Sequence, residues 1–350
     1  MRARLATGPR TRENPSAMDL FSRFGDAPRL CFWQDATSGL RAVLCLDDLR
    51  LGPAAGGIRT RTYPSDLDAV RDARRLARAM TYKCALAGLR AGGAKTVVLD
   101  HPGLKREAAF AVLGQRIEEL GGLYLAAGDL GTGPTELAAV AAHTSHVRTD
   151  EGPLAEAVAR GLVRCVRACA EQRGAELEGL RVAIQGSGAI GAAAARALAA
   201  EGARLQLTDL HVGRARELAE ELGGTVVDPA AILQAECDVL MPCAVGDVLG
   251  EAEVRALHAW AVVPGANNAV RDEAAAATLV RREVLHVPDV IASAGAVIEG
   301  VTSAIMGSPA APHFDRLEAT AREVLERSLA ERRPADAIAR ELAEARLAAA

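Results

Sequence analysis

Hydrophobic and polar positions along the chain follow two periods, which predict strands and helices in alternation. Residues 29–35 and 40–48 are apolar-rich runs that predict two strands, joined by a turn at 36–39. Ser65 is suited to cap a helix, and apolar side chains then recur at helical spacing. This stripe consists of Leu67, Val70, Ala73, Ala77 and Met80. The helix is expected to end near Lys83.

A glycine- and proline-rich segment, 51–60, is expected to form a turn upstream of this helix. After the helix, a second turn should lead to a strand at 95–100, a helix at 105–122 and a strand at 123–129. Strands that alternate with helices predict an α/β layer. Residues 18–150 are therefore expected to form one unit.

The second half of the chain continues the alternation. A long helix is expected at 154–173, and an apolar strand at 182–185 then runs into a glycine-rich turn and another helix. Further strand-like segments are found at 204–209, 224–228, 237–244, 260–266 and 284–291. Residues 151–300 are therefore expected to form a second unit, a doubly wound parallel sheet.

The two ends of the chain differ from these units. The basic segment 1–17 lacks an apolar run, so it predicts a disordered leader rather than a secretory signal. Met18 is then an alternative start to Met1. Residues 301–350 have a helical pattern and are expected to return to the first unit.

Composition narrows the class of protein. The 350 residues include 41 basic and 45 acidic side chains without a basic tract, so no nucleic acid partner is expected. No apolar run reaches the roughly 18 residues of a membrane span, so no membrane partner is expected. Seven cysteines form no CxxC pair, which favours free thiols in a reducing, cytoplasmic compartment. His143 and His146 have no ligand beside them, so no metal site is expected.

The glycine-rich turn has the context of a dinucleotide site. Its residues are Gly186, Ser187, Gly188, Ala189, Ile190 and Gly191, which follow a strand and open a helix. The glycines allow a tight turn, close approach of a pyrophosphate and close helix packing. Asp209 ends the next strand, where its carboxylate would bind ribose hydroxyls and repel a 2′-phosphate. NAD is therefore the expected cofactor, although Arg214 is suited to a phosphate; a glycine turn that binds nothing is the alternative.

Two lysines and an aspartate stand near predicted ends of elements. Lys83 and Lys95 both flank glycine pairs, and Asp129 ends a predicted strand. Each lysine alone is compatible with an ordinary surface residue. Together, one lysine can hold a carboxylate, while a desolvated second lysine would have a lowered pKa and handle protons. Beside a nicotinamide, with Asp129 as a shuttle for an amine proton, this set predicts oxidation of an amino acid at Cα.

Seven segments, in order, resemble motifs of the glutamate/leucine/phenylalanine/valine dehydrogenases. They read "LGPAAGGIRT", "MTYKCALAGLRAGGAKTVVL", "AAGDLGT", "VAIQGSGAIG", "CDVLMPCA", "GANNAV" and "PDVIASAGAVI". The resemblance covers about residues 18–300 and is closest to the leucine, valine and phenylalanine branch. It implies an α/β fold with an N-terminal substrate and dimerisation domain, a Rossmann NAD-binding domain and a deep cleft between them.

The resemblance also implies a role for each matching residue. Lys83 would hold the α-carboxylate with the backbone of Gly56 and Gly57, Lys95 would activate water, and Asp129 would act as acid and base on the amine. Further binding residues would be Asn267 and Asn268 near the nicotinamide and substrate, and Cys243 and Ala244 at the cofactor. The enzyme would be a homo-oligomer, either a dimer or an octamer.

Several positions depart from the family pattern. The stretch "PLAEAVARGL" lacks the threonine that the family usually places near the nicotinamide, and the preceding loop is short. Ser293 stands where asparagine is usual, Gly128 where leucine enzymes often have an acid, and Pro264 where glycine is common. These changes affect the cofactor and substrate pocket and leave the lysines and Asp129 in place.

The resulting prediction is NAD-dependent oxidative deamination of leucine, valine or isoleucine to the 2-oxo acid and ammonia, and the reverse amination. An apolar pocket is expected from Ala54, Ala55, Ala127, Val297 and Val301. No cation is evident for a second carboxylate, which disfavours glutamate. One alternative is the same reaction on phenylalanine or another aromatic amino acid. The second is a catalytically impaired NAD-binding regulatory homologue, which the missing threonine motivates.

Overall fold

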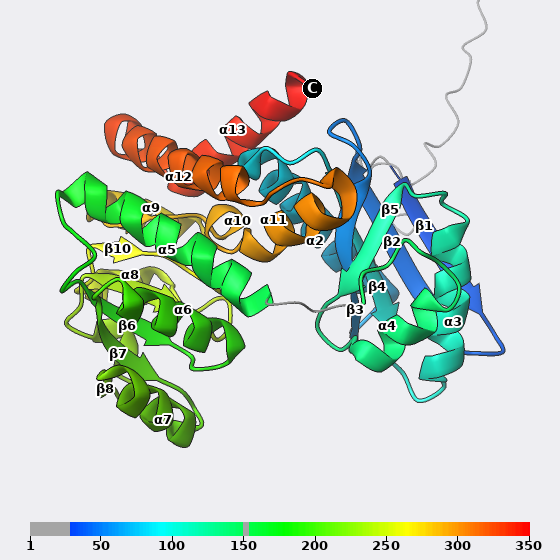
Figure 1. Cartoon of the computed structure of the whole chain (residues 1–350), viewed down its shortest axis with the longest axis horizontal. Coiled ribbons are helices and arrows are strands. Elements are labelled where there is room, and N and C mark those ends of the chain that lie inside the picture. The colour runs from blue at the N-terminus through cyan, green and yellow to red at the C-terminus, as the bar shows by residue number, and fades with distance from the viewer. Residues whose placement is uncertain (1–28, 150–153) are drawn as a thin grey trace, which may run out of the picture.

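The computed structural model describes residues 29–149 and 154–350, which form two α/β units connected by long helices (Figure 1). The leader expected at 1–17 and the alternative start at Met18 lie outside the described residues. The short loop noted before residue 154 also lies mostly outside them.

The first unit is built on a five-stranded sheet with the order β1-β2-β4-β3-β5. β2 pairs antiparallel with β1 and β4, while β3 pairs parallel with β4 and β5. The strands are β1 Arg29–Asp35, β2 Leu40–Asp48, β3 Ala54–Arg61, β4 Gly92–Leu99 and β5 Tyr124–Gly128. The strands predicted at 29–35 and 40–48 are confirmed.

Helices cover both faces of this sheet. Successive side chains of a strand point to opposite faces, so β2 divides its apolar residues between two clusters. Val43 and Cys45 pack against helix α2 (Asp66–Ala87), whereas Leu44 packs against helix α3 (Arg106–Glu118) and helix α4 (Pro134–Ala141). The sheet is thereby buried between two helical layers.

Helix α2 is longer than its sequence pattern predicted. Its start is confirmed, because the Ser65 hydroxyl accepts a hydrogen bond from the Asp68 N–H group. The predicted end near Lys83 is wrong, because the helix continues to Ala87. The C-terminal helices explain the extension: Thr320 and Arg346 donate hydrogen bonds of 3.1 and 2.6 Å to the carbonyl oxygen of Leu86. Distant residues thus satisfy a carbonyl group that a helix end leaves unpaired.

The two glycine pairs lie in strands, so the predicted turns at these positions are wrong. Gly56 belongs to β3, where a Cβ atom would lie only 1.8 Å from the carbonyl oxygen of Ala94. Gly93 belongs to β4, where a Cβ atom would lie 2.2 Å from the backbone nitrogen of Thr81 in α2. Glycine here allows close approach of strand to strand and of strand to helix. Lys95 therefore lies within β4 rather than at its start.

The second unit contains a six-stranded, fully parallel sheet with the order β11-β10-β9-β6-β7-β8. Its strands are β6 Arg181–Gln185, β7 Arg204–Thr208, β8 Thr225–Val226, β9 Val239–Pro242, β10 Ala261–Val262 and β11 Leu285–His286. Counted from β6, this is the doubly wound order in which dinucleotides bind where the order reverses. That position lies between β6 and β9.

The helices of the second unit lie between its strands and, after β11, at its C-terminal end. They are α6 Ala189–Ala200, α7 Val212–Leu222, η1 Ile232–Gln234, α8 Glu251–Ala256, α9 Glu273–Arg281, α10 Asp289–Ala292, α11 Gly295–Val301 and η2 Thr302–Met306. Helix α5 (Leu154–Arg173) packs against α6, α10, α11 and α12. Its predicted bounds, 154–173, are confirmed.

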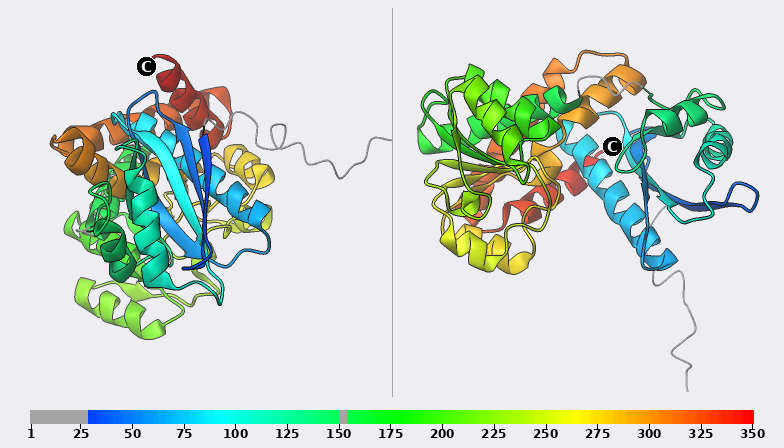
Figure 2. Two further views of the ribbon diagram at one scale, coloured as in Figure 1. Left: turned by 90° about the vertical axis from the view of Figure 1, so that its right-hand side faces the viewer. Right: turned by 90° about the horizontal axis from the view of Figure 1, so that it is seen from below.

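The chain ends with helices α12 (Ala311–Glu331) and α13 (Ala335–Ala348), which both contact α2. Helix α2 thus lies between the first sheet and the helical layer of the second unit (Figure 2). One apolar cluster joins the C-terminal end of α2 to α5, α12 and the second sheet. No helix among the described residues is long and apolar enough to cross a membrane.

Candidate active site

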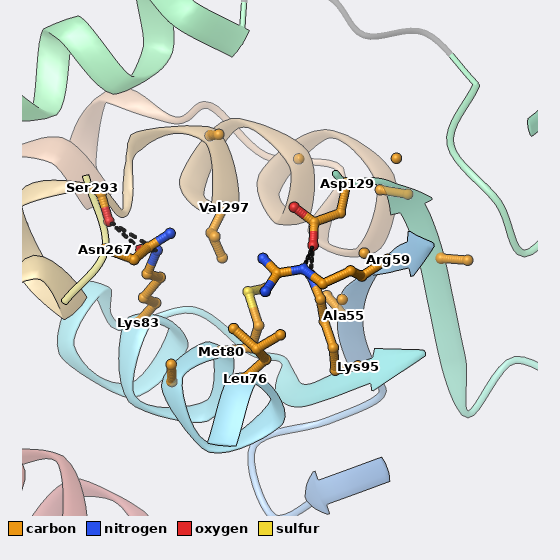
Figure 3. A pocket seen from close by; sticks show the side chains of 18 of the residues that line it. Ala55, Arg59, Leu76, Met80, Lys83, Lys95, Asp129, Asn267, Ser293 and Val297 are labelled. Carbon is orange, nitrogen blue, oxygen red and sulfur yellow. Dashed lines mark hydrogen bonds and ion pairs between the residues drawn. The ribbon is translucent and has the colours of Figure 1, made fainter. Parts of the chain in front are cut away.

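A cavity of about 530 Å³ lies between the two units (Figure 3). Its walls come from α2, β3, β4 and β5 of the first unit, and from the segments after β10 and β11 of the second. Lys83, Lys95 and Asp129 all line it, although they lie far apart in the sequence. The structure therefore brings together the three residues that the sequence singled out.

Lys95 extends from β4 into the cavity and is almost fully buried. Its Nζ atom lies 2.6 Å from Oδ2 of Asp129, and only 8% of its side chain is exposed. Burial lowers the pKa of Lys95, and the Asp129 carboxylate opposes this effect in part. A buried amine with a lowered pKa is suited to accept and return protons.

Asp129 follows directly after β5 and is held by two cations. Its Oδ2 atom accepts a hydrogen bond from Lys95 and another from Nε of Arg59, at 2.8 Å. Burial alone would raise the pKa of this carboxyl group, but Lys95 and Arg59 together lower it to about 2. Asp129 is therefore a stable carboxylate at neutral pH in this arrangement.

Lys83 lies near the C-terminal end of α2, on the opposite side of the cavity from Arg59 (Figure 3). Its Nζ atom donates hydrogen bonds of 2.9 Å to Oγ of Ser293 and 3.2 Å to Oδ1 of Asn267. Burial lowers the pKa of Lys83, which the charge of Asp289 opposes and that of Lys95 reinforces. Lys83 thus belongs to the first unit, whereas its hydrogen-bond partners come from the second.

Gly56 and Gly57 line the cavity beside the charged pair. A Cβ atom at Gly57 would lie 2.9 Å from Cβ of Asp129 and 3.0 Å from Nζ of Lys95. The carbonyl oxygen of Gly56 accepts a 2.9 Å hydrogen bond from the buried hydroxyl of Tyr124. The absence of a side chain at Gly57 is therefore a condition for the Lys95–Asp129 contact.

Asn267 and Asn268 enter the cavity from the second unit. Asn268 has a positive φ of 54°, a conformation that asparagine tolerates better than most residues. Its N–H group donates a 2.8 Å hydrogen bond to Oδ2 of Asp289, at the start of α10. Ser293 completes this wall, since its hydroxyl donates to the carbonyl oxygen of Asp289 at 2.7 Å. The serine that replaces the usual asparagine therefore retains a contact with Lys83.

The glycine-rich turn forms a cradle at the reversal point of the second sheet. Gly186 has a φ of 99°, and a Cβ atom at Gly191 would lie 1.9 Å from its carbonyl oxygen. A Cβ atom at Gly188, the N-cap of α6, would meet nothing within 4 Å. The turn is thus closed on its inner side and open to a ligand at the helix N-terminus, a geometry that fits a pyrophosphate.

Residues from two neighbouring strands flank this cradle. Asp209 follows β7; its carboxylate accepts hydrogen bonds of 2.8 Å from the N–H groups of Ser187 and His211. These bonds, with Arg214, outweigh burial and lower the pKa of Asp209. Cys243 and Ala244 follow β9, and a Cβ atom at Gly186 would lie 2.9 Å from that of Ala244. The predicted cofactor-binding residues therefore gather at one edge of the sheet.

Arg59 and Asp289 are among the contributors to the cavity that sequence reasoning missed. Arg59 follows Gly57 by two positions in β3, so both residues face the same side of the strand. The interpretation of 51–60 as a turn concealed this relationship. Asp289 carried no signal of its own, because its contacts with Asn268 and its charge opposite Lys83 depend on the packing of α10 against α2.

Comparisons with known proteins agree with this geometry. The family model described as Glu/Leu/Phe/Val dehydrogenase, dimerisation domain, matches residues 34–146. The model described as Glutamate/Leucine/Phenylalanine/Valine dehydrogenase matches residues 154–209 and 208–307. Together, the two models cover most of the chain.

Three relatives illustrate the similarity. A leucine dehydrogenase of Thermoactinomyces intermedius is 36% identical over 282 residues, which cover 78% of this chain and 77% of that protein. A phenylalanine dehydrogenase of Lysinibacillus sphaericus is 32% identical over 295 residues, covering 80% and 77% of the two chains. The crystal structure of L-tryptophan dehydrogenase from Nostoc punctiforme superposes with a TM-score of 0.82 at 28% identity, and the match covers 91% of this chain and 95% of that one.

The family models and these relatives establish the chemistry in its general form. The protein is an oxidoreductase of the amino acid dehydrogenase type, with a Rossmann-like domain for a nicotinamide cofactor. The chain belongs to the glutamate/leucine/phenylalanine/valine dehydrogenase family, in its leucine and phenylalanine branch.

Proposed function

We propose that the protein catalyses NAD-dependent oxidative deamination of an apolar L-amino acid, and the reverse reductive amination. The amino acid, NAD⁺ and water would give the 2-oxo acid, ammonium, NADH and a proton. The observation that carries this proposal is the placement of Lys83, Lys95 and Asp129 around one cavity, between apolar walls. Segments that follow β10 and β11 of the second sheet, which also carries the cofactor cradle, form one wall of this cavity.

Lys83 is proposed to hold the α-carboxylate. Its ammonium group faces the cavity, and its two neutral oxygen partners, on Asn267 and Ser293, do not neutralise it. A carboxylate would add a contact in which donor and acceptor are both charged, which is stronger than the contacts of the ammonium group with neutral oxygens. The backbone of Gly56 and Gly57 would border the same carboxylate.

Asp129 and Lys95 are proposed to act at the α-amino group and at Cα. The Asp129 carboxylate would orient the amine, whose proton it can accept during the reaction. Lys95, close to Cα, would take a proton from the water that attacks the imine and polarise the carbonyl group in the reverse direction. The bound nicotinamide supplies the hydride acceptor. Separation of the site from solvent by the two units would favour these charge interactions.

The cradle favours NAD as the form of the cofactor. Asp209 presents a carboxylate at the end of β7, where the ribose of the adenosine half is expected to lie. A 2′-phosphate at this position would face a negative charge. The positive charge of Arg214 would offset this repulsion only weakly, since it already acts on the Asp209 carboxylate.

The walls of the cavity favour an apolar side chain. Leu76 and Met80 of α2, Ala55 and Ala127 of the first sheet, and Val297 of α11 line it. Three arginines that the sequence did not place here, Arg59, Arg75 and Arg148, also line the cavity. Arg59 and Arg75 are nevertheless engaged with carboxylates of the protein. The apolar walls therefore support an apolar amino acid, rather than glutamate, as the substrate we propose.

Leucine, valine and isoleucine are the proposed substrates, and aromatic amino acids are the second candidate. The second candidate is favoured by the small residues Ala55 and Gly128, which leave room in the cavity. One methylene group changes discrimination by only about 1–3 kcal/mol, so the aliphatic substrates are expected to overlap. We further propose that the enzyme is a cytoplasmic homo-oligomer, a dimer or an octamer, whose mass light scattering would give.

A substrate panel tests the proposal. NADH formation would be followed at alkaline pH with individual L-amino acids, with NADP⁺ in place of NAD⁺ as the cofactor control. Turnover of leucine, valine or isoleucine with NAD⁺ is expected. Turnover of phenylalanine or tryptophan alone would transfer the proposal to the aromatic candidate. Binding of NAD⁺ without turnover of any amino acid would instead identify a catalytically impaired homologue.

A further inference from the structure

Arg59 lines the cavity beside the Lys95–Asp129 pair. It extends from β3 and donates from Nε to Oδ2 of Asp129 at 2.8 Å, the same oxygen that Lys95 contacts at 2.6 Å (Figure 3). Only 14% of the Arg59 side chain is exposed. Among the contacts described for residues 29–149 and 154–350, none engages Oδ1 of Asp129, which is therefore left for a ligand in the cavity.

Arg59 is itself held in place by a second carboxylate. Its Nη1 atom lies 3.4 Å from Oδ2 of Asp72 in α2, and the hydroxyl of Tyr63 donates to that oxygen at 2.7 Å. Arg75 binds Oδ1 of Asp72 at 2.8 Å. The side chain of Asp72 is as little exposed as that of Arg59, at 14%. Carboxylates and cations thus alternate from the cavity to the surface of α2.

A purely structural ion pair would not need this arrangement. Arg59 shares one oxygen of Asp129 with Lys95, although a bidentate contact with both oxygens is the common geometry of arginine and carboxylate pairs. The shared contact sets which oxygen of Asp129 faces the two cations. It also keeps the second oxygen turned away from both cations.

We propose that Arg59 is a positioning residue for the deamination reaction: it holds Asp129 with one oxygen on Lys95 and the other toward the substrate amine, and Asp72 and Tyr63 hold Arg59. This inference rests on the proposed function of the cavity. It gives Asp72 and Tyr63, which do not reach the reacting atoms, a role in the geometry of the site.

The charges around Lys95 set its pKa, so a change at Arg59 should alter the pH dependence of the reaction. Burial lowers the pKa of Lys95, Asp129 from the end of β5 raises it, Arg59 from β3 lowers it, and Asp72 from α2 raises it. Lys83, across the cavity, adds a further positive charge that is coupled to Lys95. Removal of the Arg59 charge should therefore raise the pKa of Lys95. Deamination requires Lys95 in its neutral form, so the pH at which this form appears should rise as well.

The Arg59→Gln variant of the full chain tests this role. We expect a loss of kcat of about 10²-fold, because the misplaced carboxylate no longer orients the amine. The rising limb of the pH profile of kcat/KM should move to higher pH by about one unit. The KM for NAD⁺ should stay unchanged, since the cofactor cradle lies on the second sheet.

Two control variants distinguish the effect of the Arg59 position from the effect of its charge and from a general loss of stability. Arg59→Lys keeps the charge and should retain the native position of the pH limb, with part of the lost kcat restored. Arg71→Gln makes the same substitution on the exposed face of α2, where the structure pairs Arg71 with Asp68, and should resemble the native enzyme. If Arg59→Gln does not fold, Tyr63→Phe serves as the test. A rising limb of the pH profile that moves to higher pH, together with a loss of kcat of about fivefold, supports the inference.

The outcomes distinguish the inference from the function on which it rests. Turnover by Arg59→Gln with native kcat and a native pH profile would overturn the role of Arg59 and leave the proposed function intact. A profile of Tyr63→Phe that superimposes on the native one would do the same where Arg59→Gln is unfolded. Absence of amino acid turnover in the native protein would overturn both.

Discussion

Nζ of Lys95 lies 2.6 Å from Oδ2 of Asp129; Lys95 lies in β4 and Asp129 directly follows β5, and these two strands are not neighbours in the sheet. β3 lies between β4 and β5, so the contact must pass over the backbone of β3. It does so at Gly57, where a Cβ atom would approach both side chains to 3.0 Å or less. A glycine in the middle strand thus makes this ion pair possible.

Replacement of Lys95 by alanine should abolish most of the deamination activity. Positioned acid–base groups contribute about 10²–10⁴-fold, so a loss in kcat of this size is expected. Stopped-flow or steady-state measurement of NADH formation would show it. Binding of NAD⁺, followed by fluorescence, serves as the control and should be unchanged; a variant with native kcat would contradict the role of Lys95.

Replacement of Lys83 by methionine should affect substrate binding more than cofactor binding. A hydrogen bond to a charged group is worth about 1.5–3 kcal/mol, so the KM for the amino acid should rise by about tenfold to a hundredfold. Steady-state kinetics with each substrate varied in turn would measure this. An unchanged KM for the amino acid would show that its carboxylate binds elsewhere.

Gly57→Ala should separate Lys95 from Asp129. The new Cβ atom would lie 2.9 Å from Cβ of Asp129 and 3.0 Å from Nζ of Lys95, so one of them must move. A loss of about 10²-fold in kcat is expected, as for other misplaced catalytic groups. Gly213→Ala in α7 is the matched control, because a Cβ atom there would meet nothing within 4 Å. The control should keep native activity, and equal losses in both variants would refute the steric argument.

Asp209→Asn should weaken the preference for NAD⁺ over NADP⁺. The carboxylate would repel a 2′-phosphate, whereas the amide would not, so the ratio of kcat/KM for the two cofactors should shift toward NADP⁺ by about tenfold or more. Initial rates with both cofactors at one amino acid concentration would measure the ratio. A ratio that stays constant would mean that Asp209 does not face the ribose.

Asp129 should make the stability of the protein sensitive to acid. Its folded pKa, about 2, lies below the ordinary value of 3.8, so it stabilises the native state above the ordinary value. This contribution should be lost as the pH falls from about 4 toward 2. Urea unfolding of native protein and Asp129→Asn at several pH values would reveal a difference that shrinks with acid. A difference independent of pH would exclude the ion pair as its source.

Local patterns predicted much of the fold correctly. The strands at 29–35 and 40–48, the Ser65 cap and the helix at 154–173 are confirmed, because period and capping are properties of adjacent residues. The end of α2 could not be predicted in this way. Its last carbonyl groups find donors on Thr320 and Arg346, more than two hundred positions away in the chain.

For the site, the sequence by itself determined the chemical inventory: two lysines, one aspartate, a glycine-rich turn and the acid that follows it. Only the tertiary structure decided which groups meet, because that depends on strand order and on the packing of α2 against both units. It placed Arg59 against Asp129, and Ser293 and Asn267 against Lys83. The charge of a buried group is set by such neighbours, which no stretch of adjacent residues contains.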